Sequence, residues 1–152
     1  MDKNYRYIDL FCGIGGFHQA LSSLGHECVF ASDIDKKCRE TYEINYGIKP
    51  EGDITQIDEK DVPNHDIICA GFPCQAFSVA GKRRGFDDTR GTLFFDIARI
   101  CSEKRPRHLV LENVKGLLSH ESGQTFHTIL KVLSDMGYDV EWQVLNSKDF
   151  GV

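Results

Sequence analysis

Residues 9–17 read Asp-Leu-Phe-Cys-Gly-Ile-Gly-Gly-Phe, and they join a predicted strand, Arg6–Phe11, to a predicted helix, Phe17–Leu24. Glycines at a turn from strand to helix let the backbone approach a ligand that a Cβ atom would exclude. A dinucleotide-binding GxGxxG sequence would need its third glycine at His18, and a phosphate-binding P-loop would need a Gly-Lys-Ser/Thr sequence after the turn. Both are missing from the sequence, so the turn favours a nucleoside ligand without phosphates.

Apolar segments with β-branched residues alternate with segments of helical periodicity along the rest of the chain. The further predicted strands are Cys28–Ser32, Asp66–Ala70, His108–Glu112 and Tyr138–Leu145. The further predicted helices run from a cap at Asp35 to about Tyr46, over Thr92–Lys104 and over Gln124–Met136, and a glycine-rich loop covers residues 71–91. This alternation predicts an α/β fold with a mainly parallel sheet and helices on both faces.

The size and composition are typical of one globular domain, since 152 residues with 41% hydrophobic and 27% charged positions can bury a sizeable core. No apolar run is long enough to cross a membrane, and the N-terminal residues lack a signal-peptide pattern, so we expect a cytoplasmic protein. Six cysteines occur without CxxC pairs or Cys/His ligand spacing, which argues against disulfides and against a metal site. The net charge of −5 argues against a generally basic nucleic-acid-binding surface.

Two acidic residues follow the glycine turn at positions that suit a nucleoside. Asp33 comes after the second predicted strand, about twenty residues beyond the turn, where an acid accepts hydrogen bonds from ribose hydroxyls. Asp53 could accept from an adenine amino group while the neighbouring Ile54 covers the ring. Taken singly, Asp33 is as readily a helix cap and Asp53 a turn residue. Their joint placement favours the ligand-binding interpretation.

A cysteine and a glutamate follow two other predicted strands. Cys74 lies in the sequence GFPCQAFS, directly after the buried strand Asp66–Ala70, at the carboxyl end where open α/β sheets carry their chemistry. A lone cysteine is usually a packing residue, but a proline-fixed loop favours a nucleophile, which reacts as the thiolate. Glu112 ends the strand HLVLE, and if buried it could share a proton with a ring nitrogen; a solvated strand-end residue is the alternative. We expect the two loops to face one site.

The sequences DLFCGIGGF, GFPCQAFS and LENVKGL, in this order, resemble the cofactor loop, the Pro-Cys motif and the Glu-Asn-Val motif of the DNA (cytosine-5) methyltransferases. The resemblance covers essentially the whole chain and is strongest to bacterial restriction-modification enzymes of the HhaI type. It implies the Rossmann-like fold of S-adenosylmethionine-dependent methyltransferases. Members of this family continue with an arginine-containing motif, a target-recognition domain and a C-terminal segment. We therefore expect residues 1–152 to be the N-terminal portion of a catalytic domain.

The resemblance also implies roles for individual residues. Cys74 would add to C6 of a cytosine flipped out of duplex DNA, and Glu112 would bind the N3 and N4 edge of the base. Contacts to S-adenosylmethionine are implied for Phe11, Gly13, Ile14, Gly15, Gly16, Asp33, Ile34, Asp53, Ile54, Phe72 and Leu93. Contacts to the DNA or the target base are implied for Pro73, Gln75, Ser78, Lys82, Arg83, Arg84, Arg90, Asn113 and Val114. The product would be S-adenosylhomocysteine, and no metal is implied.

Other functions fit the sequence less well. A zinc-dependent cytosine deaminase would need a Pro-Cys-x-x-Cys element and a His-x-Glu motif, but Gln75-Ala76-Phe77 follows Cys74. A cofactor-binding part that stays inactive until it is complemented by a C-terminal part is a second alternative. A tRNA cytosine-5 methyltransferase is a third.

Overall fold

The computed structural model describes residues 4–74 and 93–151. The predicted DNA contacts Gln75, Ser78, Lys82, Arg83, Arg84 and Arg90 lie outside these residues. The chain forms two compact units, Met1–Asn113 and Val114–Val152, and each is described by itself.

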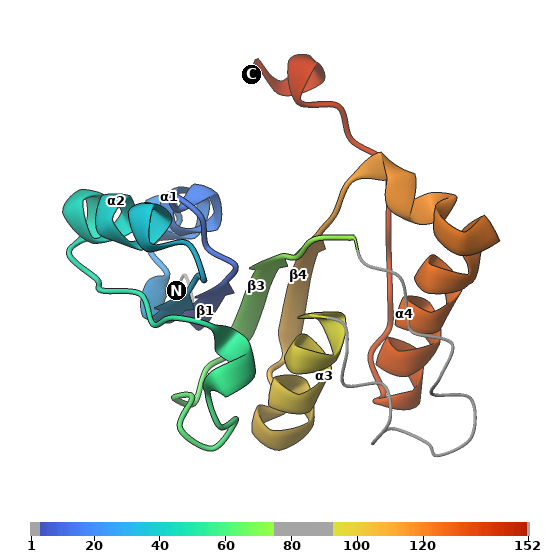
Figure 1. Cartoon of the computed structure of the whole chain (residues 1–152), viewed down its shortest axis with the longest axis horizontal. Coiled ribbons are helices and arrows are strands. Elements are labelled where there is room, and N and C mark those ends of the chain that lie inside the picture. The colour runs from blue at the N-terminus through green and yellow to red at the C-terminus, as the bar shows by residue number, and fades with distance from the viewer. Residues whose placement is uncertain (1–3, 75–92, 152) are drawn as a thin grey trace. The chain divides into compact units, whose positions relative to one another are not determined.

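The first unit is built on a parallel sheet of four strands, in the spatial order β2-β1-β3-β4 (Figure 1). The strands are β1 (Arg6–Leu10), β2 (Glu27–Ser32), β3 (Ile67–Gly71) and β4 (His108–Glu112). Because all four strands run in the same direction, the loops that follow them leave from one edge of the sheet. The predicted α/β fold with a parallel sheet is confirmed.

Three helices connect the strands: α1 (Gly16–Ser23), α2 (Lys36–Tyr46) and α3 (Leu93–Lys104). Phe17 and Leu21 of α1 pack against a buried cluster that contains Tyr7 and Ile67. The connection from β3 to β4 crosses the sheet in the opposite direction from the connection between β1 and β2. Right-handed crossovers therefore place α3 on the opposite face from α1.

Local sequence explains both ends of α2. The carboxylate of Asp35 accepts hydrogen bonds from the backbone N–H groups of Lys37 (2.7 Å) and Cys38 (3.1 Å), as a helix N-cap does. Gly47 follows the last turn with a φ of 71°, a conformation that glycine adopts without strain. The cap at Asp35 was predicted and is confirmed.

After α2 the chain returns to the edge of the sheet beside β2. Glu51 forms an isolated parallel bridge with Ser32, because its N–H donates to the carbonyl of Ala31 (2.8 Å) and its carbonyl accepts from Asp33 (3.1 Å). A short 3₁₀ helix, η1 (Ile54–Gln56), follows two residues later. This path brings Asp53 next to the end of β2.

The second unit contains three 3₁₀ segments and one longer helix. They are η4 (Lys115–Leu118), η5 (His120–Gly123), α4 (Gln124–Asp135) and η6 (Ser147–Phe150). The side chains of Thr125, Ile129, Val132 and Leu133 form the buried face of α4. Within the described part of the chain, no helix is long and apolar enough to cross a membrane.

The predicted strand Tyr138–Leu145 is wrong. Its alternating polar and apolar residues favour extended backbone, but a strand also needs a partner for its hydrogen bonds, and these residues belong to no ladder within residues 4–74 and 93–151. Instead, the Trp142 ring packs edge-on against Phe126 of α4, with ring centroids 5.1 Å apart. A side-chain contact to α4 thus replaces the predicted pairing.

Candidate functional site

The glycine turn begins with a residue in an unusual conformation. Phe11 follows β1 with a φ of 56°, a left-handed conformation that is uncommon for an aromatic residue and is often found at functional sites. Beyond it, the N–H of Cys12 donates to the carbonyl of Ser32 (3.0 Å), and the N–H of Gly15 donates to the carbonyl of Cys12 (2.9 Å). The turn is therefore anchored both to itself and to the end of β2.

Asp33 connects this turn to the start of α2. One carboxylate oxygen accepts the N–H of Gly13 at 2.8 Å, and the other accepts the N–H of Asp35 at 2.8 Å. Asp33 is therefore not the cap of α2, which is Asp35. Each carboxylate oxygen can accept a further hydrogen bond, so the half-buried Asp33 still has capacity for a ligand hydroxyl.

The glycine turn is also supported by four connected side chains that the sequence analysis missed. The hydroxyl of Tyr46 donates to the carbonyl of Gly15 (3.1 Å), and its ring stacks on His18 at a centroid distance of 3.9 Å. The Nδ1 atom of His18 shares a hydrogen bond of 2.7 Å with the Tyr42 hydroxyl, which also donates to Asp9 (3.3 Å). The i, i+4 spacing of Tyr42 and Tyr46 on one helix face was the available signal.

Asp9 is fully buried in this cluster. Burial raises the pKa of its carboxyl from the ordinary value of 3.8 to about 7, while the Tyr42 hydroxyl and the His18 backbone N–H lower it in part. The second carboxylate oxygen, Oδ1, has no hydrogen-bond partner among the described residues. A protonated Asp9 needs no compensating charge, so burial under the turn favours its neutral form below about pH 7.

Asp53, the second acid predicted to bind the ligand, lies at the start of η1. The carboxylate of Asp53 caps this short helix by accepting the N–H of Thr55 at 3.0 Å, which agrees with the turn interpretation. Its other oxygen can accept a hydrogen bond from a ligand. Ile54 is only 3% exposed, so its side chain packs in the protein core, whereas Ile14 and Ile34 are 63% and 75% exposed. Exposed apolar surface for a ring therefore lies at Ile14 and Ile34.

The carboxyl ends of β3 and β4 bring together the loop of Cys74 and the side chain of Glu112. The two strands pair so that Gly71 lies beside Glu112. A Cβ atom at Gly71 would lie 3.2 Å from the Glu112 Oε2 atom, so this carboxylate rests against the backbone that leads into the loop. Cys74 follows three residues later, within roughly 11 Å of Gly71 along the chain.

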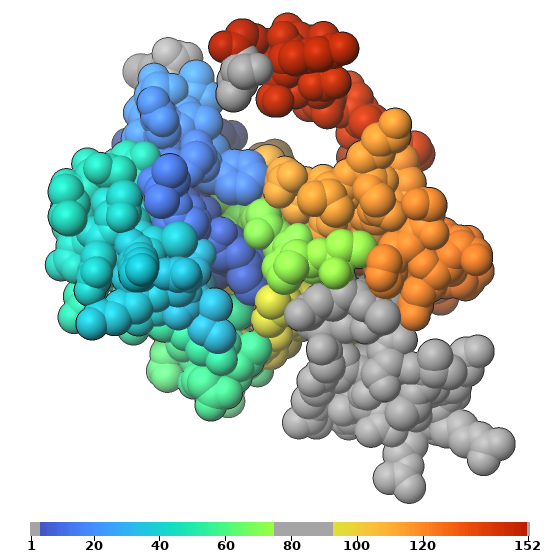
Figure 2. Space-filling view, turned by 45° about the horizontal axis from the view of Figure 1, so that its top comes forward, coloured from blue at the N-terminus to red at the C-terminus, as the bar shows by residue number. Residues whose placement is uncertain are grey.

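The start of the cysteine loop is held by side chains of both neighbouring elements. The Asn113 side-chain amide donates to the carbonyl of Phe72 at 2.6 Å. The Phe72 ring is buried and packs at a tilt against Phe94 of α3, with centroids 5.8 Å apart. Pro73 is exposed and Cys74 is half-buried, and Figure 2 shows the light-green residues that end β3 reaching the surface.

Of the two alternatives that the sequence leaves for Glu112, a buried acid and a solvated strand-end residue, the structure supports the second, because the Glu112 side chain is exposed. Side chains of β4 alternate between exposed and half-buried, because successive side chains of a strand point to opposite faces of the sheet. Glu112 lies on the exposed face, together with His108 and Val110. Of the remaining predicted contacts, Leu93 is half-buried at the start of α3, and Val114 is 63% exposed at the start of the second unit.

All six cysteines are free thiols in the structure. Cys12, Cys69 and Cys101 are buried, and burial raises the pKa of each thiol above its ordinary value. Cys28, Cys38 and Cys74 are half-buried. Among the three half-buried thiols, Cys74 alone follows a strand at the carboxyl edge of the sheet.

Residues 5–152 match the family described as C-5 cytosine-specific DNA methylase. The chain is 54% identical over 147 residues to the type II methyltransferase M.HhaI of Haemophilus parahaemolyticus, covering 97% of this chain and 45% of that protein. It is 54% identical over 154 residues to the type II methyltransferase M.HpaII of Haemophilus parainfluenzae, covering 99% of this chain and 43% of that protein.

Among solved structures, the Dnmt2 methyltransferase of S. pombe superimposes with a TM-score of 0.76 at 27% identity. The match covers 97% of this chain and 46% of that one. The chain thus spans somewhat under half the length of the relatives that it matches.

Proposed function

Because the chain belongs to the C-5 cytosine-specific DNA methylase family, we propose that the protein containing it methylates C5 of cytosine in DNA, with S-adenosylmethionine as the methyl donor. The observation that carries this proposal is the juxtaposition at the ends of β3 and β4. The Glu112 carboxylate rests against Gly71, three residues before Cys74, so a nucleophile and a hydrogen-bonding acid leave adjacent strands.

These two residues account for the covalent addition to the base. Carbon 5 of cytosine is a poor nucleophile until a group adds to carbon 6. In our proposal the Cys74 thiolate forms a bond to C6, and the electron pair of the C5–C6 double bond then attacks the methyl group. The bond between the methyl group and the sulfonium sulfur breaks as the new C–C bond forms. A water molecule then takes the proton from C5, the double bond re-forms, and Cys74 departs as the thiolate. Glu112 binds the N3 and N4 edge, where charge changes during the attack.

The residues around the glycine turn fit an adenosine-containing methyl donor. The backbone is open at Gly13 and Gly16, because a Cβ atom at either position would meet no described atom within 4 Å. The carboxylates of Asp33 and Asp53 are acceptors suited to ribose hydroxyls and an adenine amino group. When bound, S-adenosylmethionine supplies an activated methyl group on its sulfonium and leaves as S-adenosylhomocysteine. The implied contacts of Phe11, Ile14, Gly15, Ile34, Ile54, Phe72 and Leu93 are part of this proposal.

For the substrate we propose duplex DNA with the target cytosine flipped out of the stack, at a cost of a few kcal/mol. The family name supports DNA over tRNA, and the type II names of the relatives support a role in a restriction-modification system. The exposed Pro73 and Val114 and the Asn113 side chain are the described residues proposed to lie near the base. The basic residues between positions 82 and 90 remain predicted phosphate contacts.

The test is covalent trapping with the full-length protein. Duplex DNA containing 5-fluorocytosine should form a stable adduct, because fluorine at C5 cannot leave as a proton does. We expect Cys74→Ser to abolish the adduct and the matched control Cys38→Ser, another half-buried cysteine, to retain it. An adduct in Cys74→Ser would overturn the mechanism, and methyl transfer to tRNA but not to DNA would overturn the substrate.

A second candidate is a cofactor-binding part that needs its complement. It is favoured by the length of the match, which covers 45% of M.HhaI and 43% of M.HpaII. We expect residues 1–152 alone to transfer methyl groups weakly or not at all. Rapid turnover by this part alone would refute the candidate.

A further inference from the structure

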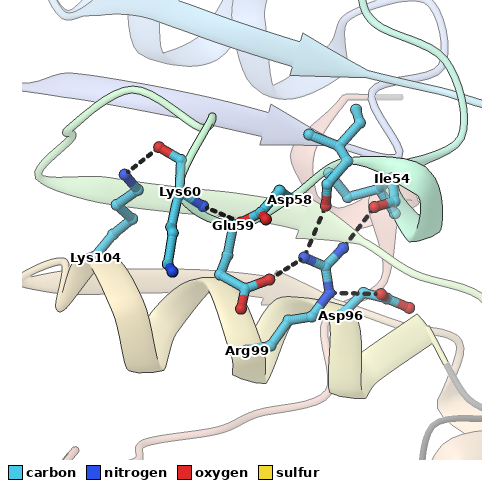
Figure 3. Close-up of polar contacts among 8 residues, drawn as sticks. Ile54, Asp58, Glu59, Lys60, Asp96, Arg99 and Lys104 are labelled. Atoms are coloured by element: carbon cyan, nitrogen blue, oxygen red, sulfur yellow. Dashed lines mark hydrogen bonds and ion pairs between the residues drawn. The ribbon is translucent and has the colours of Figure 1, made fainter.

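Arg99, on the central turns of α3, binds a loop that is distant in the sequence but contains a proposed cofactor contact (Figure 3). Its Nη2 donates to the carbonyl of Ile54 at 2.6 Å, and its Nη1 donates to the carbonyl of Ile57 at 2.9 Å. Nη1 also donates to the Glu59 carboxylate at 2.8 Å. One guanidinium therefore holds three acceptors between positions 54 and 59.

A fourth hydrogen bond orients the guanidinium. Its Nε donates to the Asp96 carboxylate at 2.9 Å, one turn earlier on the same helix. The side chain of Arg99 is 27% exposed and that of Asp96 is 18% exposed. Because both groups are mostly removed from water, a fixed geometry between them is more effective than it would be on an open surface.

The carbonyls that Arg99 binds belong to the turn that Asp53 begins. The Asp53 carboxylate caps η1 through Thr55, and the N–H of Ile57 closes the turn on the carbonyl of Ile54 at 3.2 Å. The carbonyl of Ile57, just past the helix end, needs a partner from outside the helix, and Arg99 supplies it. Arg99 also gives the carbonyl of Ile54 a second hydrogen bond, so it determines where the turn lies relative to α3.

Arginine suits this position in a way that lysine does not. The planar guanidinium has five N–H donors in fixed directions, so it can bind two carbonyls and two carboxylates at once. The neighbouring cation on α3 provides a comparison, since the ammonium of Lys104 makes one hydrogen bond, to the carbonyl of Lys60 at 3.0 Å (Figure 3). Lys104 therefore contacts the same loop without holding η1.

We propose that Arg99 is a positioning residue for the cofactor site, acting through the Asp53–Ile57 turn. This inference rests on the proposed function, in which Asp53 binds the adenine amino group. It also links two proposed contacts, because α3 begins at Leu93, roughly 9 Å along the helix axis from Arg99. Through Arg99, the turn that contains Asp53 is fixed to α3, the helix that begins at Leu93.

The experiment measures the affinity of the full-length protein for S-adenosylhomocysteine by calorimetry, together with the melting temperature. We expect Arg99→Gln to raise the Kd about tenfold, by analogy with metal sites, where removing a residue that orients a ligating group costs about tenfold or more. Arg99→Lys should stay impaired, because an ammonium cannot reach all the acceptors. The control Lys104→Gln should leave the Kd unchanged.

A second control separates positioning from general stability. Ile100 is fully buried on the same helix, so Ile100→Val should lower the melting temperature without changing the Kd. If Arg99→Gln does not fold, Arg99→Lys serves as the test variant. A Kd for the Arg99 variants equal to that of the wild type would overturn the inference, and so would a weakened Kd in Ile100→Val of the same size.

A double-variant cycle identifies the route of the effect. If Arg99 acts through Asp53, Arg99→Gln should weaken binding much less in an Asp53→Asn background than in the wild type. Fully additive effects would overturn this route. Failure of the proposed function looks different, since the wild-type protein itself would then not bind S-adenosylhomocysteine.

Discussion

Replacing Gly15 by alanine tests whether the glycine turn rests on the Tyr46 ring. Gly15 has a φ of 97°, and an added Cβ atom would clash with the Cε2 atom of Tyr46. The ring cannot move freely, because it stacks on His18 and its hydroxyl binds the carbonyl of Gly15. The substitution must therefore strain the backbone and also displace the ring.

The two effects have separable magnitudes. An L-residue in a left-handed conformation costs about 1–2 kcal/mol. Displacing Tyr46 forfeits a hydrogen bond of about 1 kcal/mol and a stacking contact of about 0.5–1.5 kcal/mol. We expect Gly15→Ala to lower the free energy of unfolding by roughly 2.5–4.5 kcal/mol.

Two glycines of the same turn are matched controls. Gly13 also has a positive φ, of 52°, but an added Cβ atom there meets nothing within 4 Å, so alanine should cost about 1 kcal/mol from strain alone. Gly16 begins α1 with open space around it, and alanine there should be neutral or stabilising by up to about 1 kcal/mol.

Urea unfolding of the ligand-free protein measures all three variants. The expected order of stability is Gly16→Ala, then Gly13→Ala, then Gly15→Ala. In a Tyr46→Ala background the cost of Gly15→Ala should fall to that of Gly13→Ala. Equal costs for Gly13→Ala and Gly15→Ala in the wild-type background would refute the proposed contact with Tyr46.

Two further predictions concern the polar side chains of Asp9 and Asn113. The pKa of Asp9 is raised from 3.8 to about 7, so the folded state keeps a proton that the unfolded state releases between about pH 4 and 7, and stability falls as pH rises through this window. Across this window the free energy of unfolding should fall by an amount on the order of 4 kcal/mol, since each pKa unit corresponds to about 1.4 kcal/mol, and Asp9→Asn should remove this fall. Urea unfolding at several pH values measures the effect. The same dependence of the unfolding free energy on pH in Asp9→Asn as in the wild type would contradict the prediction. Asn113→Ala removes the 2.6 Å bond to Phe72 and should cost about 1 kcal/mol. It should also slow adduct formation at Cys74 while leaving cofactor affinity unchanged, and an unchanged adduct rate contradicts this.

Much of the fold could be predicted because its signals are local. The cap at Asp35 and the glycine at position 47 lie within a few residues of the helix that they bound, and both act through backbone conformation. The strands β1, β3 and β4 are short apolar segments between turns, so they too could be read from their neighbours. The strand predicted at Tyr138–Leu145 failed because pairing depends on a partner elsewhere.

The candidate site shows the same division. Its motifs could be found in the sequence, since a glycine turn, a Pro-Cys loop and a strand-end glutamate are each contiguous. The cluster around Asp9 could not be found in the sequence, because the sequence does not show whether an aspartate is buried, and it is burial that raises the pKa of Asp9. Arg99 was missed for a related reason, since its three loop acceptors lie 40 to 45 residues away in the chain.

The glycine turn, the cysteine loop and the Glu-Asn-Val sequence were thus determined by the sequence alone, because backbone conformation and motif order are properties of neighbouring residues. The tertiary structure decided that Glu112 is exposed and lies against Gly71, that Asp33 ties the turn to α2, and that Arg99 holds the Asp53 turn. Each of these depends on strand register or helix packing, which bring together atoms that are distant along the chain.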